Sequence, residues 1–105
     1  MDENQILHKI STDQLLIVYY SVPTCSVCKV LRPKVEELVA GYDIATFLYV
    51  NIENHPAIKG LQMVFTVPTV ILYGQGKEIQ RWSRHFSVAD LRRMLDRYNQ
   101  LLANE

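Results

Sequence analysis

The stretch QLLIVYY, residues 14–20, constrains the fold of this chain more than any other feature. It is a nearly continuous run of apolar, β-branched and aromatic residues. A strand with one solvated face would show alternating polar side chains, and this run does not. Such a run is typical of a strand that is buried on both faces. We therefore expect a central strand with helices packed above and below it.

The segments around this strand alternate between helical and strand periodicity, without an internal repeat or a long linker. The chain is predicted to form helices at residues 3–10, 25–41, 55–63 and after Ser87, and further strands at residues 45–52, 67–73 and 77–82. A strand–helix–strand unit requires a right-handed crossover and a parallel pair. The GQG hairpin signal before the last strand requires an antiparallel pair. The predicted fold class is α/β, with a mixed four-stranded sheet flanked by helices on both faces.

Length and charge narrow the possible functions. A chain of 105 residues fits one domain, residues 1–105, and the 11 basic residues balance the 11 acidic residues. This balance indicates neither a nucleic-acid partner nor a membrane surface. The first ten residues, MDENQILHKI, lack the apolar core of a secretory signal. We therefore expect a cytoplasmic monomer, in which a cysteine pair points to catalysis or metal binding rather than to a structural disulfide.

The chain has two cysteines, and both lie in TCSVCKVLRP, residues 24–33. The pair follows the central strand directly, so we expect Cys25 in the first turn of a helix with Thr24 as its cap. Unpaired backbone N–H groups and the helix dipole would then favour the thiolate and lower the pKa of Cys25 below its usual value of about 8.5. Cys28 would lie one turn deeper, close enough to form a disulfide. This placement predicts that Cys25 attacks a substrate and Cys28 resolves the adduct.

Two other interpretations of the cysteine pair remain open at this point. The cysteines are either inert buried residues or half of a zinc site. Zinc needs two further ligands, and His8, His55 and His85 lie far apart without the spacing that a zinc site uses. We therefore expect no metal and no cofactor.

Four motifs together resemble the thioredoxin family along nearly the whole chain. They are CSVC at a strand-to-helix junction, Pro33 five positions later, VNIENHP at residues 50–56 and VPT at residues 67–69. The resemblance implies a thioredoxin fold that lacks the first edge strand of the family, because the N-terminal part is short.

The same resemblance implies a function and a binding surface. The function is thiol–disulfide exchange with protein or small-molecule disulfides, with a reductase that recycles the protein. Pro68 matches the family's proline that is cis and lies beside the cysteine pair. A proline at a strand start leaves one backbone position without a donor. We expect Val67 to pair its backbone with an extended substrate, in a groove formed with Val27 and Pro68.

The chain departs from the family pattern around the cysteines. Thr24 stands where the family has a tryptophan, and Ser26 and Val27 replace a Gly-Pro pair. Tyr19 replaces a buried acid, and Tyr49 replaces a lysine. A tyrosine with a pKa near 10 is no base at pH 7, so we expect Cys28 to keep a pKa at or above about 8.5. Resolution by Cys28 should then be slow and should accelerate with rising pH.

Two functional classes fit this sequence. The first is a thiol–disulfide oxidoreductase that uses Cys25 and Cys28. The second is a thioredoxin-fold adaptor that binds partners through the groove around Val27, Val67 and Pro68, with little or no redox turnover. Arg84 and His85 either line the rim of this site and favour anions or belong to a solvated loop.

Overall fold

The computed structural model describes residues 1–84 and 86–103 of the chain. In chain order the elements of these residues are α1 (Glu3–Thr12), β1 (Leu15–Ser21), α2 (Cys28–Ala40), β2 (Ala45–Asn51), α3 (Pro56–Leu61), β3 (Thr69–Gly74), β4 (Lys77–Ser83) and α4 (Val88–Ala103). The described strands form one sheet in the order β2-β1-β3-β4. The β1–β2 pair is parallel, and the β1–β3 and β3–β4 pairs are antiparallel. The predicted mixed four-stranded α/β fold is therefore confirmed.

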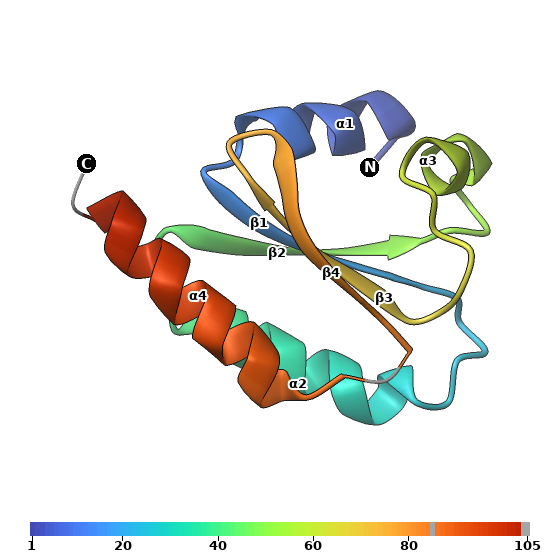
Figure 1. Ribbon diagram of the computed structural model, residues 1–105. Helices are drawn as coiled ribbons and strands as arrows, with labels where there is room; N and C mark the ends of the chain where they lie inside the picture. The colour runs from blue at the N-terminus through green and yellow to red at the C-terminus, as the bar shows by residue number, and fades with distance from the viewer. Residues whose placement is uncertain (85, 104–105) are drawn as a thin grey trace.

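Helices cover both faces of the sheet. Figure 1 shows α1 and α3 on one face and α2 and α4 on the other. Every residue of β1 is buried, and its side chains alternate between two apolar clusters. Leu16, Val18 and Tyr20 pack with α1 and α3. The second cluster joins the other side of β1 to α2 and α4 through Leu15, Ile17, Tyr19, Val35, Val39, Leu91 and Leu95. The expected doubly buried central strand is confirmed.

Local hydrogen bonds explain where the helices begin and end. Asp2 and Gln5 form a reciprocal capping box at the start of α1. This helix runs to Thr12, two residues beyond the predicted end, and the hydroxyls of Ser11 and Thr12 both donate to the His8 carbonyl. At α4 the Ser87 hydroxyl accepts a hydrogen bond from the Ala89 N–H at 3.1 Å, which agrees with the predicted cap.

The predicted hairpin joins β3 to β4. Gly74 pairs with Lys77, and the two residues between them have positive φ angles of 51° for Gln75 and 87° for Gly76. Two consecutive positive φ angles define the type I′ turn, whose twist matches that of the flanking strands. Glycine adopts this conformation without a steric penalty, which explains why Gly76 stands there.

Two neighbouring tyrosines of β1 have different environments. Tyr19 and Tyr20 are both 0% exposed and point to opposite faces of the sheet. The Tyr20 hydroxyl lies 2.8 Å from that of Tyr73, which donates to the Gln62 side chain at 2.7 Å. Among the described protein atoms the Tyr19 hydroxyl has no hydrogen-bond partner. Burial raises the pKa of Tyr19 and of Tyr20 to about 12, so both side chains are neutral phenols at pH 7.

These contacts predict unequal effects of removing the two hydroxyls. Tyr20→Phe deletes one member of the buried chain to Tyr73 and should lower the free energy of unfolding by about 1–2 kcal/mol. Tyr19→Phe deletes a hydroxyl that bonds no described protein atom and should leave stability unchanged or raise it by up to about 1 kcal/mol. Urea unfolding at constant m-value measures both. A larger loss for Tyr19→Phe than for Tyr20→Phe would contradict the assignment.

Candidate active site

Strand register brings the two sequence motifs to one end of the sheet. Tyr20 lies opposite Thr69, and Thr69 lies opposite Ser83. The end of β1, the start of β3 and the end of β4 therefore lie together at one end of the sheet, on the right in Figure 1. The cysteine pair follows β1 and Pro68 precedes β3, so the fold gathers both motifs at this end. Arg84 follows β4 there, whereas His85 lies outside the described residues.

Cys25 and Cys28 form a disulfide with their Cα atoms 5.5 Å apart. This separation falls within the ordinary range for a disulfide. The two sulfur-bearing residues differ in access to solvent. Cys28 is 7% exposed and packs in the cluster under α2, whereas Cys25 is partly exposed at the edge of that cluster. A thiol that approaches from solvent therefore meets Cys25 first.

The predicted start of the helix at Cys25 is wrong, because α2 begins at Cys28 and has Val27 as its cap residue. Two successive turns precede the helix, closed by hydrogen bonds from the Cys25 N–H to the Val22 carbonyl and from the Lys29 N–H to the Ser26 carbonyl. Thr24 is therefore no cap. Cys25 precedes the first helical turn instead of lying in it, so its access to solvent is the stronger reason to assign it the first attack.

The Val67–Pro68 peptide bond is cis. Pro68 is buried, and its carbonyl accepts a hydrogen bond from the Arg84 N–H at 2.7 Å. Val67 is half-buried, and within the described residues its backbone makes no hydrogen bond to another backbone group. Val27, between the cysteines, is 52% exposed. This end of the sheet thus presents an exposed apolar side chain and a backbone segment that can still accept and donate hydrogen bonds.

Aromatic rings and one cation occupy the place where the family has an acid and a lysine. The rings of Tyr19 and Tyr49 stack with their centroids 6.2 Å apart, and the Arg32 guanidinium lies 3.9 Å from the centroid of the Tyr49 ring. This is the geometry of a cation–π contact. Burial, with a smaller contribution from Tyr49 and against the effect of Arg32, raises the pKa of Tyr19 to about 12. Tyr19 is therefore no general base at neutral pH.

Sequence reasoning missed Ser21, the last residue of β1. Its side chain is fully buried, and its Oγ lies 2.7 Å from the Cys28 sulfur. A serine at the end of a strand looks like an ordinary turn residue, so composition and periodicity gave no signal. The signal that was available is spacing, because Ser21 lies on the same face of β1 as Tyr19, the face that α2 covers.

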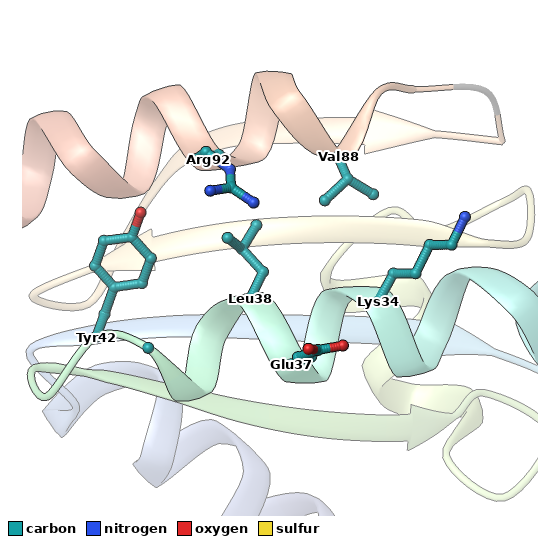
Figure 2. A pocket seen from close by; sticks show the side chains of 7 residues that line it. Lys34, Glu37, Leu38, Tyr42, Val88 and Arg92 are labelled. Carbon is teal, nitrogen blue, oxygen red and sulfur yellow. The ribbon is translucent and has the colours of Figure 1, made fainter.

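Hollows on the surface do not by themselves mark the site. The groove in Figure 2, of about 510 Å³, lies between α2 and α4 and contains neither cysteine. Its walls are Lys34, Glu37, Leu38, Gly41, Tyr42, Val88 and Arg92. A second hollow lies beside Val27 and is mostly apolar, with Lys34 and Arg84 at its rim. Within the described residues there is no cluster of three or more side chains suited to a metal ion.

Helix length and hydropathy decide whether a helix could span a membrane. Among the described residues, no helix is both long and apolar enough to cross a membrane.

Comparisons with known proteins agree with this geometry. The chain matches the Thioredoxin family model over residues 2–97. It is 38% identical over 72 residues to a thioredoxin of Chlamydia caviae, a match that covers 69% of this chain and 70% of that relative. It is 32% identical to the mitochondrial thioredoxin-2 of Schizosaccharomyces pombe, where the match covers 70% of this chain but only 55% of the relative.

Solved structures show the same fold. The structure of thioredoxin 1 from Thermosipho africanus matches with a TM-score of 0.76 and 31% identity, over 86% of this chain and 99% of that one. A mutant thioredoxin from Halobacterium salinarum matches with a TM-score of 0.83 at 19% identity, over 94% and 87% of the two chains. Its low identity supports the fold alone. The match over residues 2–97, together with the relative that is 38% identical, shows that the chain belongs to the thioredoxin family.

Proposed function

We propose that the protein is a thiol–disulfide oxidoreductase that exchanges disulfides with protein or small-molecule substrates. The observation that carries this proposal is the Cys25–Cys28 disulfide, with one accessible and one buried sulfur. In the reduced protein, Cys25 attacks a substrate disulfide and forms a mixed disulfide. Cys28 then attacks the Cys25 sulfur, which releases the substrate and closes the 25–28 bond.

The substrate-binding surface consists of Val27, Val67 and Pro68. Val27 offers an exposed apolar contact beside the accessible sulfur. The Val67 backbone lies outside the ladder of β3, which starts at Thr69. An extended peptide can pair with this free backbone in the manner of an added strand. Pairing through the backbone gives affinity without a strict sequence preference, which suits a protein that acts on several substrates.

The proposed partners are disulfide-containing proteins and a reductase that returns the pair to the dithiol form. We also propose the cytoplasm as the compartment, with the protein acting as a monomer. Both cysteines of the chain belong to the pair, so none remains for a purely structural disulfide. A reducing compartment would keep the pair ready for the first attack.

The division of roles predicts opposite results for two serine variants. Cys28→Ser should keep the first attack and accumulate mixed disulfides with a disulfide-containing protein substrate, because no second thiol can release them. Cys25→Ser should form no such adducts, because the remaining sulfur is buried. Non-reducing electrophoresis measures the adducts. Adducts that form with Cys25→Ser and not with Cys28→Ser would reverse the assignment.

The difference in exposure also predicts where alkylation occurs. Iodoacetamide added to the reduced protein near pH 6 should modify Cys25 at least about tenfold faster than Cys28, because Cys28 is buried. The oxidoreductase function also requires Cys25 to react faster than a free thiol, since the thiolate is the reactive form. Peptide mass spectrometry after timed quenching locates the label. If Cys25 reacts no faster than a free thiol, the adaptor interpretation gains support over the oxidoreductase.

Pairing of the substrate with the Val67 backbone can be tested from the substrate side. Peptide disulfides are compared with analogues in which one backbone amide next to the cysteine is N-methylated. Methylation of the amide that bonds the Val67 carbonyl should lower kcat/KM by about tenfold, the effect of one lost hydrogen bond. Methylation of the adjacent amide, whose N–H points away from Val67 in an extended peptide, serves as the control. Equal effects at all positions would argue against strand-like pairing.

A further inference from the structure

Among the described side chains, that of Ser21 is the only one that forms a hydrogen bond with a sulfur of the pair, and the exchange proposed for the two cysteines gives it no role. It is 0% exposed, and apart from tyrosines only Ser21 and Thr69 are buried polar residues in the described part of the chain. The Ser21 carbonyl accepts a hydrogen bond from the Ile52 N–H at 3.0 Å, which holds this backbone beside the end of β2. Buried hydroxyls in proteins are almost always hydrogen-bonded. Here the nearest partner is the Cys28 sulfur.

The direction of this hydrogen bond follows from the chemistry of the two atoms. The Ser21 Oγ lies 2.7 Å from the Cys28 Sγ and 3.4 Å from the Val22 carbonyl oxygen. A disulfide sulfur carries no proton, so in the oxidised protein the hydroxyl is the donor. In the reduced protein a Cys28 thiol can donate to Oγ while the hydroxyl turns to Val22. When Cys28 is a thiolate, the hydroxyl must turn back to the sulfur.

We propose, on the basis of the exchange function above, that Ser21 is a catalytic residue for the Cys28 half of the reaction. Its hydroxyl donates a hydrogen bond to the Cys28 sulfur whenever that sulfur carries negative charge. Hydrogen bonds to a charged acceptor are roughly twice as strong as those between neutral groups. The contact therefore favours the thiolate over the thiol and takes over part of the task of the acid that the family has at the position of Tyr19.

The hydroxyl acts in both directions of the exchange. During resolution, the Cys28 thiolate attacks the Cys25 sulfur, the 25–28 bond forms and the bond from Cys25 to the substrate breaks. The substrate sulfur leaves with the electron pair and takes a proton from water, so the dithiol is oxidised and the substrate disulfide is reduced. In the reverse direction an incoming thiolate attacks Cys25, and Cys28 leaves with the electron pair. Ser21 keeps its own proton throughout.

The other polar groups on this side of the sheet do not replace the hydroxyl. From β1 comes Tyr19, a neutral phenol, and from β2 comes Tyr49, whose ring carries the Arg32 guanidinium of α2 at 3.9 Å. The charged groups between α4 and α2 are Arg92 of α4 and Lys34 and Glu37 of α2, which line the groove in Figure 2. No carboxylate, amine or imidazole is buried among the described residues. Among the described side chains, only the Ser21 hydroxyl forms a hydrogen bond with the Cys28 sulfur.

Removing the hydroxyl should change the pH dependence of one step. In Ser21→Ala the midpoint of the Cys28 titration should move upward by about one pH unit. At pH 7 resolution should slow by about three- to tenfold, because the loss of thiolate outweighs the gain in nucleophilicity of a more basic sulfur. Above the midpoints of both proteins the order should reverse, because the thiolate fractions are then equal and the more basic sulfur of Ser21→Ala is the better nucleophile. At every pH, attack by Cys25 should be as fast in Ser21→Ala as in the wild type.

The kinetic test uses the aromatic disulfide 5,5′-dithiobis(2-nitrobenzoate) with the reduced full-length protein in a stopped-flow instrument. Attack by Cys25 releases the first coloured thiolate and resolution by Cys28 releases the second, so one trace reports both steps. Ser21→Thr and Ser21→Val form a matched pair of equal shape with and without the hydroxyl, which separates chemistry from packing. Ser83→Ala, at the exposed end of β4, is the control for a serine lost at the same end of the sheet.

A second measurement makes the outcome independent of turnover. The Cys28 titration is followed by NMR on reduced protein that carries ¹³Cβ-labelled cysteine, without any substrate. We expect the midpoint to be higher in Ser21→Ala and Ser21→Val than in the wild type and in Ser21→Thr. Equal midpoints, or a second phase slowed by the same factor at all pH values, would overturn the role of Ser21. A wild-type protein that releases no thionitrobenzoate contradicts the exchange function, while the titration still decides the Ser21 contact.

Discussion

The burial of β1 on both faces is the constraint on which the rest of the structure depends. Each fully buried Leu, Ile or Val side chain contributes roughly 1.5–3 kcal/mol, and β1 carries such residues on both sides. Because neither face can be left in water, helices must cover both, and β2 and β3 must pair with its two edges. The strand therefore ends inside the protein, and the chain that leaves it must turn sharply before a helix can start.

This constraint determines where the reacting sulfurs and the substrate-binding backbone lie. The turn after β1 carries the accessible Cys25, and the first helical turn buries Cys28 against the same face as Tyr19 and Ser21. The antiparallel register of β3 brings Val67 and the cis Pro68 to the same end of the sheet. The fold thus brings together one accessible sulfur, one buried sulfur and one free stretch of backbone. The proposed reaction uses these groups and needs no cofactor or metal. Their different environments account for the different roles.

Most of the fold could be predicted from the sequence, because it depends on periodicity. Residues 14–20 are apolar on both faces, and Gln75-Gly76 has the chemistry of a type I′ turn. The start of α2 could not be predicted, because the two turns before Cys28 are closed by backbone hydrogen bonds that leave no mark on composition. The cysteines and Pro68 were found by motif spacing. Motif spacing did not reveal the role of Ser21 or the stacking of Tyr49 on Tyr19, since each depends on contacts between different elements.

The central claim is that Cys25 and Cys28 form a reversible redox pair, and equilibration with glutathione tests it most directly. The protein is incubated at a series of ratios of reduced to oxidised glutathione, quenched with acid and analysed by mass spectrometry. The account predicts one two-electron transition between the dithiol and the 25–28 disulfide, at a potential between about −270 and −120 mV, the range of known exchange proteins. A pair that stays reduced in oxidised glutathione, or that ends as separate glutathione adducts without a 25–28 bond, would contradict the account.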